Sequence, residues 1–252
     1  MRLSHDQVVL VTGASSGIGR AVAHVLAGRG CHLLLTGRDA NRLAAVAEGV
    51  SGTPFVCDLA DTQQTDDLAD RLSDHPVPDI VVHNAGVGLA HQAVDTSESE
   101  VRHLLQVNLV APMRLTRALL PAMRRRGSGR LVFVTSIAGR LGVADESAYA
   151  ASKAALGVYA ASLRAELAGS GVGVTTVVPG VVATEFFRRR GDGAPYTRRF
   201  PRPMPVATMA DALVHAVEHE RAEAVVPRWL RLPIAVNALA PGLYSRLAGR
   251  FG

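Results

Sequence analysis

Short apolar runs alternate along the chain with longer stretches in which apolar residues recur at intervals of three and four. The short runs have the length of buried strands, and the longer stretches have the period of helices that bury one face. This alternation predicts a parallel, doubly wound sheet with helices on both faces. The expected strands are 7–12, 32–36, 53–57, 79–83, 130–135, 173–178 and 224–227, and the expected helices are 18–29, 41–50, 61–73, 98–126, 147–168 and 209–220.

No linker, internal repeat or low-complexity block interrupts this pattern, so we expect one α/β domain over residues 1–252 with about seven strands. A chain of this length can bury a full hydrophobic core. A glycine-rich turn at Gly13 comes too early for a signal peptide, and no apolar run reaches about 18 residues, so a cytoplasmic location is expected. Cys31 and Cys57 lie in or beside apolar runs and are interpreted as reduced core thiols.

The positive charge is concentrated at the end of the chain. Residues 1–184 hold 16 basic and 16 acidic side chains, whereas residues 185–252 hold 11 and 6, which accounts for the net +5. Without an aromatic and basic array or a known motif, this distribution does not favour nucleic-acid binding. Lys153 is the only lysine, and the other 26 cations are arginine. A bias toward arginine that spares one lysine suggests a role that a guanidinium cannot fill.

A glycine-rich turn directly follows the first expected strand. Its glycines let the backbone approach a pyrophosphate, and the next helix offers its positive N-terminus. The spacing departs from G-x-G-x-x-G because three residues separate the first two glycines, and a plain tight turn is the alternative. The position after a strand favours nucleotide binding. The candidate contacts are Gly13, Ser15, Ser16, Gly17, Ile18 and Gly19.

The end of the second expected strand indicates whether the cofactor is NAD or NADP. Sites that select NAD usually place a carboxylate about 20 residues past the loop, where it holds the ribose hydroxyl. Here Gly37 and Arg38 occupy that place, and a guanidinium can pair with a 2′-phosphate. The alternative is that Arg38 is solvated while Asp39 caps the next helix. We therefore predict NADP rather than NAD as the cofactor.

Three residues form the candidate catalytic group. Ser136 follows the fifth expected strand, and Tyr149 and Lys153 lie four apart, so they share one helix face. A tyrosine hydroxyl has a pKa of about 10, and a neighbouring cation favours its phenolate form. Tyr-x-x-x-Lys is common by chance, but chance is a poor explanation beside Ser136, an upstream phosphate loop and a single lysine.

Taken together, these motifs resemble the short-chain dehydrogenase/reductase family over nearly the whole chain. The resemblance implies a Rossmann fold and an NADP(H)-dependent oxidoreductase that transfers a hydride between the nicotinamide and a carbonyl or secondary alcohol. The motifs that carry it are Thr12-Gly13-x-x-x-Gly17-x-Gly19, Asp58-Leu59, Asn84-Ala85-Gly86, Asn108 in Val-Asn-Leu, Ser136, Tyr149-x-x-x-Lys153, and Pro179-Gly180 followed by Thr184.

The resemblance also implies roles. Tyr149 is the general acid in reduction and the base in oxidation, Lys153 lowers its pKa and binds the nicotinamide ribose, and Ser136 orients the carbonyl. Asn108, in the long helix, helps to hold a water that relays protons to Lys153. The chain has His83 where the family often has asparagine, and we expect this residue to pack near the cofactor with little effect. No metal is implied. The remaining implied cofactor contacts are Asp58, Leu59, Asn84, Ala85, Gly86, Pro179, Gly180, Val182 and Thr184.

Three further segments carry weaker signals. His215-Ala-Val-Glu-His219 fits the H-x-x-E-H pattern of a zinc-protease class, but it has no evident third ligand and is interpreted as a solvated helix face. Residues 185–205 are the expected substrate lid. Its arginines are interpreted mainly as solvated, with an acidic carrier-bound substrate as the alternative. The lid contains Phe186, Phe187, Tyr196 and Phe200 with Arg188, Arg189, Arg190, Arg198, Arg199 and Arg202.

The tail, residues 228–252, is apolar and basic, and Pro233 and Pro241 are expected to break any long helix. It departs from bacterial β-ketoacyl carrier reductases and is more similar to family members that act on bulky ketones. Packing over the substrate pocket or against another subunit is preferred to peripheral membrane contact. The substrate is therefore expected to be a bulky or hydrophobic ketone. The alternatives are a 3-oxoacyl thioester reductase and a non-catalytic NADP-binding regulator, and a homodimer or homotetramer is expected.

Overall fold

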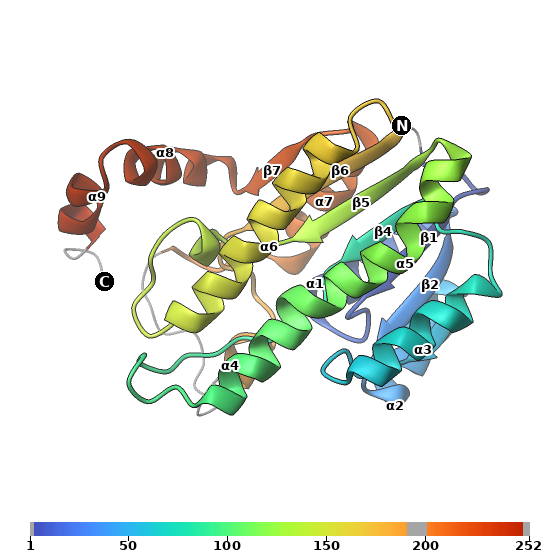
Figure 1. Cartoon of the computed structure of the whole chain (residues 1–252), viewed down its shortest axis with the longest axis horizontal. Helices are drawn as coiled ribbons and strands as arrows, with labels where there is room; N and C mark the ends of the chain where they lie inside the picture. Colours follow the sequence, from blue (N-terminus) through green and yellow to red (C-terminus); the bar gives the residue numbers. More distant parts are fainter. Residues whose placement is uncertain (1–2, 191–200, 249–252) are drawn as a thin grey trace.

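The structure, a computed structural model, describes residues 3–190 and 201–248. Seven parallel strands form one sheet in the order β3-β2-β1-β4-β5-β6-β7, so the predicted fold class is confirmed (Figure 1). Each expected strand lies within one residue of the observed bounds. The strands are β1 (Val8–Thr12), β2 (His32–Gly37), β3 (Thr53–Val56), β4 (Ile80–His83), β5 (Gly129–Val134), β6 (Val172–Pro179) and β7 (Glu223–Val226).

Alternating side chains of the strands build two cores, one on each face of the sheet. In β1, Val9 and Val11 belong to one core, whereas Val8 and Leu10 belong to the other. One core is covered by α1 (Gly17–Gly28), α2 (Ala40–Val50) and α7 (Val206–Glu218). The other is covered by α3 (Thr62–Ser73), α5 (Ala111–Arg126) and α6 (Ser147–Glu166). Burial on both faces explains why the strands read as continuous apolar runs.

The strand order reverses at β1, which pairs with β2 on one side and β4 on the other. The loops that leave these strands diverge to opposite faces of the sheet, so a crevice opens between them. The phosphate loop follows β1, and the Asn84 segment follows β4. The topology alone thus brings together two motifs that lie about 70 residues apart in the sequence.

The expectation of one continuous helix over residues 98–126 is wrong. The structure has α4 (Glu98–Leu105), a π-helical turn (Gln106–Val110) and α5 (Ala111–Arg126). Pro112 lacks the N–H that an α-helix would use to reach the carbonyl of Asn108, and the N–H of Ala111 bonds to the carbonyl of Gln106, five residues back. Such π turns are frequent at functional sites.

The tail forms two short helices, α8 (Arg231–Leu239) and α9 (Pro241–Ala248), which are separated just before Pro241, as expected for a proline that breaks a long helix. Pro233 lies in the first turn of α8, and Pro241 begins α9, where a missing N–H costs little. The two helices extend from the end of the sheet as an arm (Figure 1). Within the described part of the chain, no helix combines the length and the hydrophobicity needed to cross a bilayer.

Candidate active site

A cleft of about 1280 Å³ opens at the carboxyl edge of the sheet, and it gathers nearly all the residues that the sequence singled out. Gly19 and Asn108 are the exceptions, since neither lines it. The predicted residues that line the cleft are Gly13, Ser15, Ser16, Gly17, Ile18, Arg38, Asp58, Leu59, Asn84, Ala85, Gly86, Ser136, Tyr149, Lys153, Pro179, Gly180, Val182 and Thr184.

The phosphate loop is a cradle that only glycine can form. Gly13 and Gly17 have φ angles of +67° and +54°, which other residues rarely adopt. Ser16 is the N-cap of α1 but makes no side-chain cap bond, so the helix N-terminus faces the cleft without a side-chain cap. A Cβ at Gly19 would lie 2.3 Å from the Gly13 carbonyl oxygen, so Gly19 permits close packing rather than ligand contact. This shape and these donors fit a pyrophosphate.

Asn84 fixes the loop from the neighbouring strand. Its side-chain amide donates to the carbonyl of Thr12 at 2.9 Å, and the hydroxyl of Thr12 accepts from the N–H groups of Asn84 and Ala85 at 3.0 Å each. Asp58 lies across the cleft, where its carboxylate accepts from the N–H of Ala60 at 3.0 Å. The bonds of Thr12 join the loops after β1 and β4, whereas the bond of Asp58 fixes only its own turn after β3.

Arg38 is exposed at the cleft edge after β2 and has no ion pair within residues 3–190 and 201–248. Asp39 caps α2, as the alternative interpretation expected, by accepting from the N–H of Arg42 at 3.0 Å. The side chain of Arg42 bonds to Glu185 at 3.0 Å. Arg38 therefore remains available for a charged ligand in the cleft.

Tyr149 and Ser136 lie together in the cleft. Tyr149 is buried, with 7% of its surface exposed, and this burial raises the pKa of its hydroxyl to about 12. A hydrogen bond with Ser136 acts in the opposite direction on that pKa. The Ser136 hydroxyl also accepts from the N–H of Ala138 at 3.1 Å, which fixes its position after β5.

Lys153 is buried beside them, and its ammonium donates to the carbonyl of Val134 at 3.0 Å. Burial lowers the pKa of Lys153 to about 8. The charges that act on the Tyr149 hydroxyl are Glu146, which raises its pKa, and Arg190, which lowers it. The role of Lys153 in lowering the pKa of Tyr149 stays a prediction, which rests on the two residues sharing one face of α6.

Asn108 lies fully buried behind the cleft, in the π-helical turn. Its side-chain oxygen accepts from the N–H of Val87 at 2.8 Å, and its amide donates to the carbonyl of Val87 at 2.9 Å and to Ser152 at 3.0 Å. A Cβ at Gly86 would lie 3.1 Å from the Lys153 nitrogen and 3.2 Å from the Asn108 oxygen. Both side chains therefore lie against Gly86, where any larger residue would crowd them.

The expectation that His83 packs near the cofactor is wrong. Its side chain points away from the cleft, stacks on Phe133 with ring centroids 4.8 Å apart, and hydrogen-bonds to Thr116 of α5 at 3.0 Å. Side chains alternate across a strand, and this position in β4 faces the core under α5. Burial lowers the pKa of His83 to about 3, so it is neutral there.

The tail helices supply cleft residues that the sequence did not identify. Phe186 from the lid packs on Tyr149 with centroids 5.6 Å apart, so an aromatic lid residue lies over the site. The sequence shows that the tail is apolar, but it does not show which tail residues face the cleft. The tail residues that line it are Trp229, Leu230, Leu232, Pro233, Val236 and Tyr244.

The lid arginines are not all solvated, which corrects their interpretation. Arg190 forms an ion pair with Glu146 in which the side chains are only 16% and 12% exposed. The N–H of Ala90 donates to the carbonyl of Arg190 at 2.7 Å. Arg189 pairs with Glu185. Tyr196, Arg198, Arg199 and Phe200 lie outside the described residues.

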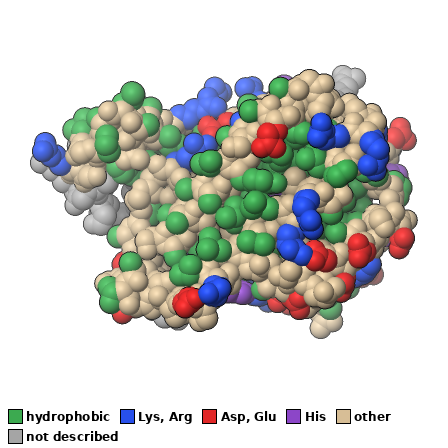
Figure 2. Space-filling view, in the orientation of Figure 1, with side chains coloured by type: hydrophobic (Ala, Val, Ile, Leu, Met, Phe, Trp, Pro, Cys, Tyr) green, Lys and Arg blue, Asp and Glu red, His purple; other side chains and the backbone are tan. Residues whose placement is uncertain are grey.

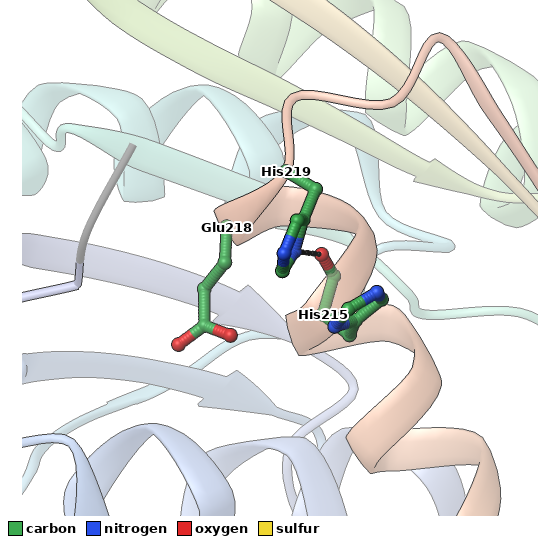
Figure 3. A group of neighbouring side chains, drawn as sticks. All are labelled: His215, Glu218 and His219. Atoms are coloured by element: carbon green, nitrogen blue, oxygen red, sulfur yellow. Dashed lines mark hydrogen bonds between the residues drawn. The ribbon is translucent and has the colours of Figure 1, made fainter.

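The H-x-x-E-H segment lies at the C-terminal end of α7 (Figure 3), and His215, Glu218 and His219 are not among the residues that line the cleft. Ligand-type atoms of His215, Glu218 and His219 lie within 4.8 Å of one another. His219 hydrogen-bonds through Nδ1 to the carbonyl of His215 at 2.9 Å, and Glu218 pairs with Arg29 at 3.4 Å. Both histidines are exposed, as expected for a solvated helix face.

The chain is similar to known proteins over most of its length. The family model described as short chain dehydrogenase matches residues 7–194. The chain is 33% identical to the ketoacyl reductase HetN of a Nostoc species over 98% of this chain and 89% of the relative.

Two solved structures cover most of the chain. The short-chain dehydrogenase of Sphingobium yanoikuyae in complex with NADPH has a TM-score of 0.84 at 29% identity, covering 95% of each chain. The bulky-bulky ketone specific alcohol dehydrogenase of Comamonas testosteroni has a TM-score of 0.80 at 26% identity, covering 94% of each. The chain belongs to the short-chain dehydrogenase/reductase family and is an NAD(P)-dependent oxidoreductase that acts on CH–OH and carbonyl groups.

Proposed function

We propose that the protein is an NADPH-dependent reductase of bulky, apolar ketones. The observation that carries this proposal is the composition of the cleft beyond Tyr149. There the walls are built by Phe186 of the lid and by Trp229, Leu232 and Val236 of the tail. Such walls bury apolar groups and offer little to a small polar substrate. The Comamonas enzyme named for bulky ketones supports the same substrate class.

Tyr149 is the proposed proton donor. Because burial raises its pKa to about 12, the hydroxyl is protonated at neutral pH and can donate to the carbonyl oxygen as that oxygen gains charge. Ser136 hydrogen-bonds to Tyr149 and can orient the same oxygen. Lys153 can then pass a proton from its ammonium to the Tyr149 phenolate, since a pKa of about 8 lets Lys153 hold or release a proton near neutrality. Asn108 holds this region rigid behind Gly86 and positions the relay.

The proposed cofactor is NADPH, which when bound supplies the hydride that reduces the carbonyl carbon. Arg38 supports this choice because it is an exposed guanidinium at the end of β2 without an ion-pair partner in the described chain. A 2′-phosphate there would gain charge-assisted hydrogen bonds. The Sphingobium relative was solved with NADPH, which agrees with this proposal. The phosphate loop, Asp58 and the segment 179–184 would hold the rest of the dinucleotide.

A 3-oxoacyl thioester is the second candidate substrate. The relative named ketoacyl reductase favours it, and the net positive charge of residues 185–252 would attract an acidic carrier. The apolar tail favours the bulky ketone instead. A non-catalytic regulator would have no use for the buried Lys153, Asn108 and Ser152 arrangement beside Tyr149.

The test is NADPH oxidation by the purified protein with aromatic ketones, steroid-like diketones, small ketones and 3-oxoacyl thioesters. Tyr149→Phe serves as the blank, and NADH is run in parallel. Turnover of bulky ketones that is lost in Tyr149→Phe supports the proposal. Turnover confined to thioesters selects the second candidate, and tight NADPH binding without any turnover selects the regulator.

We also propose a homodimer or homotetramer that pairs through α5 and α6. Met113 on α5 is 39% exposed and Val158 on α6 is 67% exposed, so each of the two long helices offers an apolar side chain that a second subunit could cover. Light scattering of the wild type and of Val158→Glu tests this. The mass should fall to that of a monomer in the variant.

A further inference from the structure

The arm formed by α8 and α9 presents an exposed apolar surface that the proposed reaction does not explain. Eight large hydrophobic side chains are exposed in the described part of the chain, of which three belong to the arm and a fourth, Trp229, lies in the turn just before it. Helix α8 contains no buried side chain. Figure 2 shows hydrophobic side chains gathered over the arm. The four tail residues are Trp229 (46%), Leu232 (71%), Leu239 (87%) and Leu243 (53%).

Apolar side chains run along the arm as a stripe that spans both helices. Leu232, Val236 and Leu239 share one face of α8 at intervals of four and three, and Leu243 continues the stripe in α9, after the break at Ala240. Leu232 and Val236 line the cleft, whereas Leu239 and Leu243 lie beyond it. The stripe therefore begins as the wall of the substrate cleft and continues onto the outer surface of the arm.

The charge of the arm has one sign. After Glu223 the sequence has no Asp or Glu, whereas Arg228, Arg231 and Arg246 are all exposed. An aliphatic stripe flanked only by arginines, with a tryptophan near one end, is the composition of a helix that lies in the interface of an anionic bilayer. An acidic protein partner would match the arginines but would not require leucines that are more than half exposed.

We propose that the arm docks on the surface of a membrane that contains anionic lipids, with Leu239 and Leu243 inserted and the three arginines at the headgroups. This docking would place the mouth of the cleft beside the lipid, where an apolar substrate would enter along the stripe. The inference stands on the surface of the arm, and its test measures binding rather than turnover, so it is independent of the proposed reaction.

The experiment is sedimentation of the full chain with phosphatidylcholine vesicles that contain or lack phosphatidylglycerol. We expect binding to the anionic vesicles that weakens as salt rises. The combined variant Arg228→Gln, Arg231→Gln and Arg246→Gln should bind about 100-fold more weakly, since each arginine contributes about fivefold near such a surface. The combined variant Leu239→Glu and Leu243→Glu should lose binding to the anionic vesicles.

Val94→Glu is the matched control, because Val94 is 85% exposed and lies outside the arm. It should bind vesicles like the wild type. Circular dichroism and NADPH binding verify that each variant is folded. The proposal is overturned if the wild type does not sediment with anionic vesicles or if Val94→Glu loses as much binding as the leucine variant. It is equally overturned if light scattering shows that the leucine variant halves the mass, because a second copy then covers the stripe.

Discussion

The two sides of the cleft are built by different means. The cofactor side is backbone held at short range, with glycines in left-handed conformations and Asn84 joining the loop of β1 to that of β4. The substrate side is made of side chains from segments far apart in the sequence, such as Phe186 in the lid and Val236 in α8. A shape made of backbone tolerates few replacements, whereas a wall of side chains can change with the substrate.

Lys153 lies where the two sides meet, and its replacement should have the largest effect. Lys153→Arg keeps the charge but puts a larger, permanently charged group into a buried site, where the pKa of the native lysine is about 8. We expect kcat/KM to fall about 1000-fold for every substrate, because proton transfer is worth about 100- to 10,000-fold. Stopped-flow or steady-state NADPH oxidation measures this.

NADPH affinity and circular dichroism of Lys153→Arg serve as controls for folding. If the variant binds NADPH and keeps wild-type turnover, the role assigned to the single lysine is wrong. A loss confined to bulky substrates would place Lys153 on the substrate side instead and would break the division of the cleft.

Arg38 tests the cofactor side alone. Arg38→Ala removes charge-assisted bonds worth about 1.5–3 kcal/mol each. NADPH should therefore bind about 30- to 100-fold more weakly, while NADH binding stays unchanged. Fluorescence titration of both nucleotides measures the two constants. Arg117→Ala, an exposed arginine outside the cleft, is the control, and equal losses for both nucleotides would contradict the assignment.

This division also explains what the sequence could predict. The strands, the phosphate loop and the Ser136, Tyr149 and Lys153 group follow from local patterns, because each depends on residues that are close in sequence or on a fixed strand end. The π turn at Asn108 depends on the absent N–H of Pro112, which the spacing of apolar residues along the helix does not reveal. The sequence does not predict toward which side His83 points or which side of α8 faces the cleft, because both depend on the segments that pack against them.

His83 tests the framework beneath the cofactor side. Its pKa is about 3 in the folded protein and about 6.5 in an unfolded chain. As the pH falls below 6.5, the unfolded state takes up a proton that the folded state does not, so the free energy of unfolding decreases. This loss should amount to about 2 kcal/mol between pH 7 and pH 5. Urea unfolding at a series of pH values measures it.

The variant His83→Asn should remove this part of the pH dependence, whatever its effect on stability at pH 7. His103→Asn, at an exposed histidine, should leave the slope as in the wild type. A wild-type slope in His83→Asn would show that other groups cause the acid sensitivity and that His83 is not held neutral by burial.

The smallest effect is expected on the substrate side, where Val236→Ala removes two carbons from the cleft wall. Each buried methylene contributes about 0.8 kcal/mol, and Val236 is only partly buried, so we expect about 1 kcal/mol, or about a fivefold rise in KM for a bulky ketone. The KM for a small ketone, the kcat and the affinity for NADPH should not change. Val94→Ala is the matched control, because the same substitution there lies outside the cleft. If Val236→Ala weakened NADPH binding as much as ketone binding, the tail would belong to the cofactor side as well. The two sides of the cleft would then be one coupled structure.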